Sequence, residues 1–300
     1  MELRHLRYFI AVAEELHFGR AAKRLGISQQ PLSQQIRNLE AELGTSLFYR
    51  TKHTVRLTEA GQVFYEGAVK TLQQAEQTVH FAQRTGRGEI GNLEVGLTGP
   101  ALSSLLPQVM SRFRQEYPGV RLTLNEMRTN LQVEALLQGQ LHVGLLHTPL
   151  YTDSLATEVV YREKLVLVLP TFHRLAHPVE IPVSLRDLAG EPFILFPRKI
   201  GPIFYDRIIS MFQQVGYSPN IVQEVIPQRS ILSLVSIGVG LTLMQKSLST
   251  IGHSGVVFRE LLEPTPELEL ALAWHPKSTH PALQNFLRLV REVASGHQPS

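Results

Sequence analysis

Residues 18–43 read FGRAAKRLGISQQPLSQQIRNLEAEL, a pattern that predicts two helices joined by a tight turn. Gly26 can adopt the left-handed conformation that ends a helix, and Ser28 is a good N-cap for the helix that follows. Pro31 is tolerated because it falls in the first turn of that second helix. An apolar stripe then recurs at helical spacing, at Leu32, Ile36, Leu39 and Leu43.

The opposite face of the second helix carries hydrogen-bonding side chains. A helix is a rod that fits the major groove, so these side chains could reach base edges and phosphates of DNA. The alternative is a helical hairpin whose amides are merely solvated, and this segment alone does not decide between the two. The polar positions are Gln29, Gln30, Ser33, Gln34 and Arg37, which follow the capping Ser28.

A basic segment with high β-propensity follows at residues 46–58, SLFYRTKHTVRLT. Its β-branched and aromatic residues surround a polar tip, which predicts a short hairpin. Its cations could contact the DNA backbone or a minor groove, although a basic hairpin can also be simply solvated. Together with the preceding helices, the hairpin predicts a winged helix-turn-helix over residues 1–58. The basic positions are Arg50, Lys52, His53 and Arg56.

Length, charge and cysteine content limit the class of protein. The chain has 300 residues, more than one core usually organises, so two or three domains are expected. The chain has 29 basic and 26 acidic residues. Residues 1–88 hold 12 of the basic and 8 of the acidic residues, and the rest of the chain holds 17 basic and 18 acidic residues. The positive excess therefore lies with the helix-turn-helix, as phosphate binding requires. The absence of cysteine, of a signal-peptide pattern and of any membrane-length apolar run predicts a cytoplasmic protein.

Residues 59–85 predict one long helix that no proline interrupts. Thr58 and Glu59 provide its cap and its acidic first turn. Its apolar residues recur three or four apart in a narrow seam, which favours a dimer contact over a core face. The alternative is that the seam packs on its own domain. The predicted dimerisation residues are Phe64, Ala68, Leu72, Ala75 and Val79.

Residues 86–91, GRGEIG, match the G-x-G-x-x-G pattern of dinucleotide sites. That fingerprint must follow a strand and open a helix, whereas this segment follows a helix and precedes a strand. We therefore interpret residues 86–91 as a flexible hinge.

From residue 92 onward, predicted strands and helices alternate, which indicates a mostly parallel sheet with helices on its faces. Two such α/β lobes would leave a cleft at the carboxyl ends of their strands. Lobe I is assigned to residues 92–162 and 268–300, and lobe II to residues 163–267. Strands are expected at 92–98, 120–126, 142–147, 164–170, 193–197, 220–226, 240–244 and 268–274, and helices at 101–116, 130–138, 202–215, 228–237 and 281–294.

Other signals for chemistry are weak. His173 and His177 lie four apart, but the surrounding PTFHRLAHPVEIP is rich in proline and offers no evident third ligand. The sequence contains no Gly-x-Ser-x-Gly elbow, P-loop or His-Glu-x-x-His motif. We therefore expect neither a metal site, nor a cofactor, nor an enzyme.

Essentially the whole chain resembles the LysR-type transcriptional regulators. The resemblance rests on residues 1–44, on the wing SLFYRTKHTVRLTEAG, and on the runs GLTGPALSSLLP, LFPRKIGPIFYD and SIGVGLTLM. It implies a winged helix-turn-helix, a linker helix that pairs two subunits, and a two-lobed effector-binding domain like periplasmic binding proteins. It also implies a homotetramer, and the branch that regulates aromatic-compound catabolism looks most similar.

The resemblance also assigns DNA-contacting positions. Two of them depart from the family pattern: Gln30 stands where proline or a small residue is frequent, and Gln34 where arginine is frequent. Glutamine at position 34 removes a cation and favours adenine readout or a water-mediated contact. The implied base and phosphate contacts are Gln29, Gln30, Pro31, Ser33, Gln34 and, in the wing, Arg50.

The resemblance maps the effector cleft onto loops of both lobes. Helix N-termini that converge on a cleft bind anions, hydroxyl groups add donors, and Ile203 and Phe204 offer apolar walls. A small carboxylate with an apolar or aromatic body would suit this site, although the threonines and serines could instead only cap helices. The implied effector residues are Thr98, Gly99, Pro100, Ser103, Thr129, Ile200, Pro202, Ile203, Phe204 and Gln228.

The sequence thus predicts an effector-responsive transcriptional regulator that works with double-stranded DNA and the transcription machinery and involves no membrane. The alternative is a two-lobed binding protein or enzyme whose N-terminal helices serve only assembly. The basic wing and the polar recognition face favour the regulator.

Overall fold

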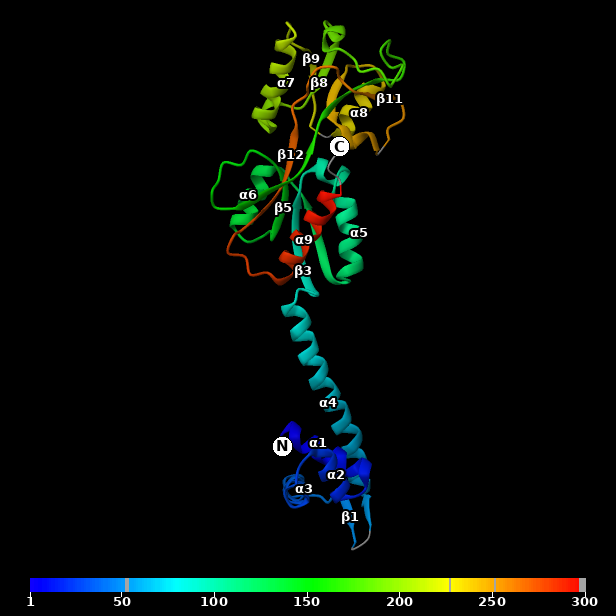
Figure 1. Cartoon of the computed structure of the whole chain (residues 1–300), viewed down its shortest axis with the longest axis vertical. Helices are drawn as coiled ribbons and strands as arrows, with labels where there is room; N and C mark the ends of the chain where they lie inside the picture. The colour runs from blue at the N-terminus through cyan, green and yellow to red at the C-terminus, as the bar shows by residue number, and fades with distance from the viewer. Residues whose placement is uncertain (52–53, 227, 251, 297–300) are drawn as a thin grey trace. The chain divides into compact units, whose positions relative to one another are not determined.

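The computed structural model describes residues 1–51, 54–226, 228–250 and 252–296. The chain divides into an N-terminal unit, Met1–Arg84, and a C-terminal unit, Thr85–Ser300 (Figure 1). Lys52 and His53, two of the basic wing positions, lie outside the described residues.

The N-terminal unit begins with three helices, α1 (Leu3–Glu15), α2 (Phe18–Leu25) and α3 (Gln29–Leu43). Gly26 ends α2 with a left-handed φ of 68°, as predicted. Ser28 occupies the N-cap position of α3 with extended backbone, but its side chain makes no capping hydrogen bond to any described residue. Leu43, at the end of α3, is 38% exposed and does not extend the stripe. The fully buried stripe consists of Leu32, Ile36 and Leu39.

The wing is a hairpin anchored in the helical core. Strands β1 (Phe48–Arg50) and β2 (Val55–Leu57) pair antiparallel, which confirms the predicted hairpin. The ring of Phe48 lies 5.1 Å from that of Phe9 and 6.0 Å from that of Phe18, centroid to centroid. The base of the wing is therefore held by the same apolar cluster that joins the helices.

The long helix α4 (Glu59–Gly86) has its first half packed on the N-terminal unit's own core. Ala68 is only 3% exposed, and the ring of Phe64 lies edge-on to Phe9 at 4.9 Å. Leu72 packs against the same cluster. The assignment of Ala68 to a dimer contact is therefore wrong, and Phe64 and Leu72 already have a partner within the domain. Helical spacing shows that a seam is apolar, but it does not show what covers the seam.

Lobe I is built on a five-stranded sheet with strand order β4-β3-β5-β12-β6. The first three strands are parallel, whereas β12 runs antiparallel to β5 and β6, so the expectation of a mostly parallel sheet fails on that side. Helices α5 and α9 cover one face and α6 covers the other (Figure 1). The elements are β3 (Ile90–Leu97), η1 (Gly99–Ser103), α5 (Leu106–Glu116), β4 (Gly119–Glu126), α6 (Thr129–Leu137), β5 (Val143–His147), β6 (Ala156–Glu163), β12 (Leu268–Trp274) and α9 (Pro281–Ser295).

Lobe II combines an antiparallel sheet of order β10-β7-β11 with a parallel pair, β8 and β9. A bridge between Phe193 and Leu241 joins the two sets. Strand β11 is four residues long and was not predicted, and neither was β6, whose polar and charged residues interrupt its apolar ones. The elements are β7 (Leu165–Pro170), η2 (Leu185–Leu188), β8 (Pro192–Leu195), η3 (Arg198–Ile200), α7 (Pro202–Gln214), β9 (Asn220–Glu224), α8 (Gln228–Ser236), β10 (Thr242–Gln245), η4 (Lys246–Thr250) and β11 (Val256–Arg259).

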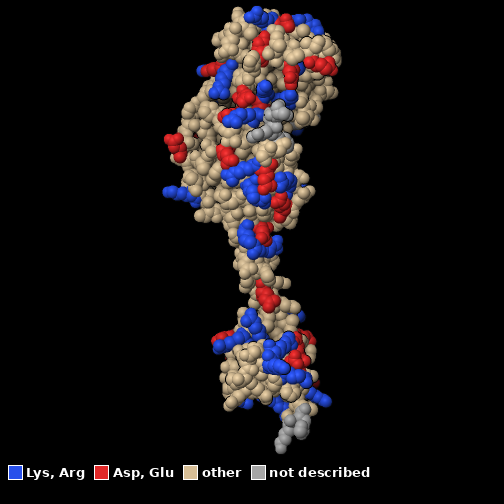
Figure 2. All heavy atoms as spheres, viewed as in Figure 1, with Lys and Arg blue, Asp and Glu red and all other residues tan. Residues whose placement is uncertain are grey.

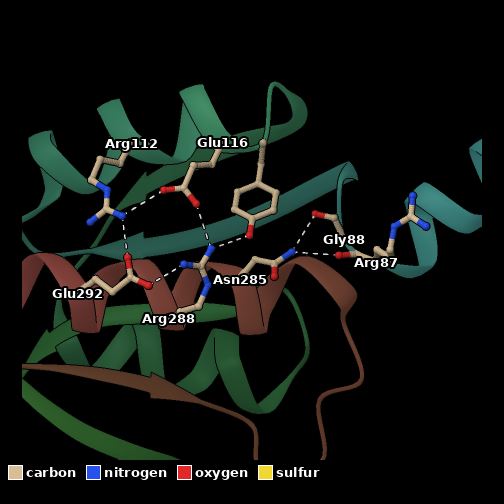
Figure 3. Close-up of polar contacts among 8 residues, drawn as sticks. Arg87, Gly88, Arg112, Glu116, Asn285, Arg288 and Glu292 are labelled. Atoms are coloured by element: carbon tan, nitrogen blue, oxygen red, sulfur yellow. Dashed lines mark hydrogen bonds and ion pairs between the residues drawn. The ribbon is translucent and has the colours of Figure 1, made fainter.

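The predicted hinge, residues 86–91, is partly fixed to lobe I. Strand β3 already begins at Ile90. Gly88 is buried with a φ of 68°, and a Cβ there would come within 2.5 Å of the Pro281 carbonyl. The amide nitrogen of Asn285 donates to the carbonyl oxygens of Arg87 at 3.0 Å and Gly88 at 3.3 Å (Figure 3). The interpretation as a free hinge is wrong for this part, because Gly88 serves a close backbone approach to α9.

The same helix, α9, is cross-linked to α5 by a network of ion pairs (Figure 3). Arg288 donates to Glu116, to Glu292 and to the Tyr117 hydroxyl group, and Arg112 donates to both carboxylates. These bonds raise the pKa of Arg288 and lower the pKa values of Glu116 and Glu292. Because the side chains are partly exposed, solvent screens the pairs, and their main effect is to align the two helices.

Candidate DNA interface and effector site

The polar face of α3 is exposed, as a DNA-reading helix requires. Gln29, Gln30 and Pro31 form its first turn and are all exposed, whereas Ser33 is half-buried. Gln34 is exposed and is hydrogen-bonded to two neighbours on the helix, Arg37 and Asn38. The first turn of α3 therefore presents the exposed side chains of Gln29 and Gln30 at the end of the helix that enters a groove in helix-turn-helix proteins.

Gln34 is held by two neighbours on α3. Its amide nitrogen donates to Asn38 Oδ1 at 2.8 Å, and its Oε1 accepts from the Arg37 guanidinium at 2.6 Å. This pairing fixes the orientation of the Gln34 amide. It also places a cation directly beside position 34, so Arg37 offers a positive charge within one helical turn.

Arg50 in the wing is not a free cation. Its guanidinium pairs with Glu40 Oε2 at 2.5 Å and lies over the Phe18 ring, 5.0 Å from the centroid. The other oxygen of Glu40 accepts from the backbone N–H groups of Leu47 and Phe48, at 2.9 and 3.2 Å. The Arg50 side chain remains 29% exposed, so it can still approach a phosphate. Glu40 was not singled out from the sequence, because its partners lie seven to ten residues away in the wing.

Charges of both signs are interspersed on the visible face of the N-terminal unit (Figure 2). Several of its arginines are paired with acids, as Arg24 is with Glu14 at 2.6 Å and Arg20 with Glu15 at 3.3 Å. The net positive charge of this unit is thus spread rather than concentrated in one patch of that face.

In lobe I the structure brings Thr98 and Thr129 to one edge of the sheet. Thr98 directly follows β3, and its backbone N–H donates to the Leu145 carbonyl of β5. Thr98 is 8% exposed, and its hydroxyl group has no hydrogen-bond partner among the described residues. The expectation that a threonine of this set caps its helix is wrong for Thr129, because Arg128 occupies the N-cap position of α6. The Thr129 hydroxyl group instead accepts from the backbone N–H of His147 at 3.3 Å.

His147, which sequence reasoning missed, ends β5 at the same edge. Its Nδ1 lies 3.1 Å from the Glu269 carbonyl, so this nitrogen carries the proton and Nε2 is left as an acceptor. Nε2 is buried and has no partner within the part of the chain that the structure describes. Burial lowers the pKa of His147, which keeps the ring neutral near pH 7. The available signal was its position at the end of the predicted strand 142–147.

The other predicted effector residues of lobe I belong to the turn after β3. Gly99 and Pro100 begin η1, and Ser103 ends it half-buried. The expected continuous helix over residues 101–116 is interrupted at Ser104, whose backbone is not helical, and α5 begins only at Leu106. The backbone at this edge is therefore a short turn, not a long helix end.

The predicted effector residues of lobe II make their contacts within their own lobe. Phe204 stacks on Phe196 with centroids 6.2 Å apart and packs against the lobe core. The Gln228 amide donates to Gln245 at 2.9 Å. Ile200 ends η3, and Pro202 and Ile203 begin α7. No hydrogen bond among the described residues links this set to Thr98 or Thr129.

Two cavities lie elsewhere in the C-terminal unit. One, of about 690 Å³, is lined along β3 and β4 by residues that include Asn92, Glu94 and Arg121. The other, of about 290 Å³, lies in lobe II beside Lys246 and Arg259. Neither cavity is lined by a predicted effector residue.

Within the described residues, no three histidine or acidic side chains gather in a way that could hold a metal ion. Nor does any described helix combine the length and apolar character that crossing a membrane requires.

An exposed polar helix, a wing and two α/β lobes define a DNA-binding transcriptional regulator with an effector-binding domain. Residues 3–62 match the bacterial regulatory helix-turn-helix protein, lysR family, and residues 86–295 match the LysR substrate binding domain. The chain belongs to the LysR family of transcriptional regulators.

Relatives and solved structures agree with this assignment over nearly the whole chain. The transcriptional regulator AlsR of Bacillus subtilis is 39% identical over 96% of this chain and 95% of its own length. The Hca operon transcriptional activator HcaR of Escherichia coli is 37% identical over 97% and 98%. The crystal structure of CbnR matches with a TM-score of 0.89 at 30% identity, covering 97% of this chain and all of CbnR. The structure of full-length CbnR complexed with its target DNA matches with a TM-score of 0.85 at 29% identity. It covers 98% of this chain and 100% of that chain. These relatives are named as regulators, so the enzyme alternative is set aside.

Proposed function

We propose that this regulator is switched by a small carboxylate with an apolar, aromatic or unsaturated body, bound where β3, β4 and β5 of lobe I end. The observation that supports this proposal is the Thr98 hydroxyl group, which is buried and has no partner among the described residues. A buried polar group without a partner is costly, and a ligand oxygen can offset that cost. The neighbouring Thr129 and His147 add polar groups at the same edge.

The ligand would act by favouring one arrangement of the two lobes. In this proposal it contacts Thr98 and Thr129 from lobe I and the start of α7, with Ile203 and Phe204, from lobe II. A ligand shifts an equilibrium only through its different affinities for the two states. Contacts from both lobes provide such a difference, because the open arrangement loses one set of them.

The matched pair Thr98→Val and Thr157→Val tests the site. Valine keeps the volume of Thr98 and removes a hydroxyl group that has no partner in the described structure, so folding should be unharmed. Thr157 is an exposed threonine of β6 and serves as the control. With benzoate and cinnamate as probes, Thr98→Val should lose the ligand-dependent change in the DNA footprint, whereas Thr157→Val should retain it. An unchanged response in Thr98→Val would place the effector elsewhere.

For DNA, we propose that Gln29, Ser33 and Gln34 read sequence while Arg50 contributes affinity for phosphate. Gln34→Ala should cost about 1–3 kcal/mol against the specific site and relax preference there. Arg50→Ala should weaken all sequences alike and reduce the salt slope by about one. Fluorescence anisotropy with the region upstream of the protein's own gene measures both. Specific and nonspecific binding that are both unaffected by Gln34→Ala would contradict this recognition face.

We further propose that the protein assembles through the exposed part of α4, around Ala75 and Val79, into a homodimer and then a homotetramer. Val79 is 55% exposed on a helix whose first half is already packed. We also propose that it acts in the cytoplasm, with DNA and the transcription machinery. A two-fold dimer would bind half-sites about 34–36 Å apart or a multiple of that spacing.

A further inference from the structure

Arg37 is an exposed arginine on the polar face of α3 that pairs with no carboxylate among the described residues. Its guanidinium donates instead to the neutral Oε1 of Gln34 at 2.6 Å. Arg20, Arg24 and Arg50 of the same unit are each paired with an acid. A neutral amide leaves the charge of a guanidinium uncompensated, so Arg37 keeps its attraction for a negatively polarised partner.

The contact with Gln34 also shows where on α3 this charge lies. Side chains of a helix point toward its N-terminus, so a long side chain covers the surface one turn before its own backbone. Arg37 follows this rule, because its guanidinium lies beside the side chain of position 34, three residues earlier. The charge is therefore displaced toward the N-terminal part of α3, which is the part of a recognition helix that contacts base edges.

The Gln34 amide is bonded at both ends along α3. Its nitrogen donates to Asn38 Oδ1 at 2.8 Å, and its oxygen accepts from Arg37. Readout of adenine by glutamine uses the oxygen for the adenine N6 amino group and the nitrogen for N7. An oxygen that already accepts from a guanidinium is a weaker acceptor for N6, so this arrangement disfavours adenine at Gln34.

The guanidinium of Arg37 has the donors that guanine requires. A guanidinium carries five N–H donors in a planar fork, and Gln34 accepts from one of its nitrogens. The N7 and O6 acceptors of guanine match two parallel N–H groups of such a fork. Because the bonds through Gln34 to Asn38 hold one part of the fork, less rotamer freedom is lost when the rest of it binds a base.

We propose that Arg37 is a specificity-determining residue that reads a guanine in the major groove, and that Gln34 is the residue that positions it. This assignment rests on the proposed function of α3 as the recognition helix, and it makes the role of Gln34 more definite. The contribution of Gln34 to specificity passes through Arg37, and Asn38 supports the same amide from its other end.

The test uses the full-length chain and DNA from the region upstream of its own gene, with binding followed by fluorescence anisotropy. Each guanine of the protected region is replaced in turn by 7-deazaguanine, which lacks N7 and still pairs with cytosine. At the guanine that Arg37 reads, this change should weaken binding of the wild-type chain about fivefold or more, which corresponds to about 1 kcal/mol or more. Arg37→Ala should bind unmodified DNA more weakly by a similar factor and should not respond to 7-deazaguanine.

Two further variants separate base reading from attraction to phosphate. Arg37→Lys keeps the charge but not the fork, so it should keep nonspecific affinity and lose the response to 7-deazaguanine. Gln34→Ala should reduce that response when Arg37 is present and should have no further effect in Arg37→Ala, which measures the coupling of the two residues. Arg114→Ala, at an exposed arginine of α5, is the control and should bind like the wild-type chain.

Equal weakening of all DNA sequences by Arg37→Ala, with a salt slope reduced by about one, would reveal a phosphate contact and overturn the proposal. A full response to 7-deazaguanine in Arg37→Lys, or additive effects of Gln34→Ala and Arg37→Ala, would also overturn it. Base preference that Gln29→Ala alters and Arg37→Ala does not would refute only the role of Arg37. Base preference that neither variant alters would refute α3 as the recognition helix. The helical transition in circular dichroism verifies that each variant is folded.

Discussion

Glu40 should be a principal determinant of the stability of the winged helix-turn-helix. Its side chain is 14% exposed, accepts two backbone N–H groups of the wing and pairs with Arg50. Hydrogen bonds to a charged group contribute about 1.5–3 kcal/mol, and their loss leaves buried donors unpaired. Glu40→Ala should therefore cost about 3 kcal/mol. Glu40→Gln keeps one acceptor oxygen for the two N–H groups but loses the charge and the acceptor for Arg50, so it should cost about 1 kcal/mol.

Circular dichroism in the far ultraviolet measures this effect, because α1 to α4 dominate the helical signal of the N-terminal unit. The only tryptophan, Trp274, lies in the C-terminal unit, so its fluorescence is an internal control that should not change. For a domain of 60–100 residues, 1 kcal/mol corresponds to about 4–8 °C in Tm. Glu40→Ala should thus lower the helical transition by roughly 12–24 °C. The exposed Glu42 is the matched control, and an equal effect of Glu42→Ala would refute the reasoning.

Four further substitutions test other parts of the structure. Val79→Glu should lower the mass measured by light scattering without lowering Tm. Phe64→Ala should instead destabilise the N-terminal unit by roughly 3 kcal/mol. A lower mass in Phe64→Ala together with an unchanged mass in Val79→Glu would restore Phe64 to a dimer contact. Burial raises the pKa of Glu163 above its ordinary 4.5, so its stabilising contribution is present below pH 4.5 and lost as pH rises through the raised pKa. Glu163→Gln should therefore raise the Trp274-monitored Tm at pH 7 but not below pH 4.5, and a constant difference would contradict this. Asn285→Ala should cost about 1 kcal/mol and accelerate amide exchange at the start of β3, while unchanged exchange would show that its two hydrogen bonds are unimportant.

The helix-turn-helix was predictable because its signals are local. Gly26 ends a helix by its own backbone preference, and the stripe through Leu32, Ile36 and Leu39 follows from helical spacing within one segment. The positions of most strands and helices in the C-terminal unit were likewise readable from alternation and turn residues. Strands β6 and β11 were missed, although β8 and β10 are as short as β11 and were predicted.

The candidate sites were only partly predictable. The resemblance to the family assigned Thr98 and Thr129 to the effector cleft, and the structure brings both to one edge of the sheet. His147 and Glu40 were missed because their roles depend on partners distant in sequence, such as Glu269 for His147. The cavity beside Arg259 and the burial of its charge also depend on tertiary packing. Arg259 contacts the carbonyl oxygens of Leu175 and Ile181, in a loop that returns to lie against β11.

The sequence by itself determined the two helices of the helix-turn-helix, their apolar stripe and the alternation of strands and helices in the C-terminal unit, because these depend on neighbours within a few residues. Only the tertiary structure decided what each face meets. The seam of α4 packs Ala68 into its own domain, Arg50 is paired with Glu40, and the segment after α4 is tied to Asn285. The physical reason is that periodicity describes one element alone, whereas the partner of a face or a charge is chosen by long-range packing.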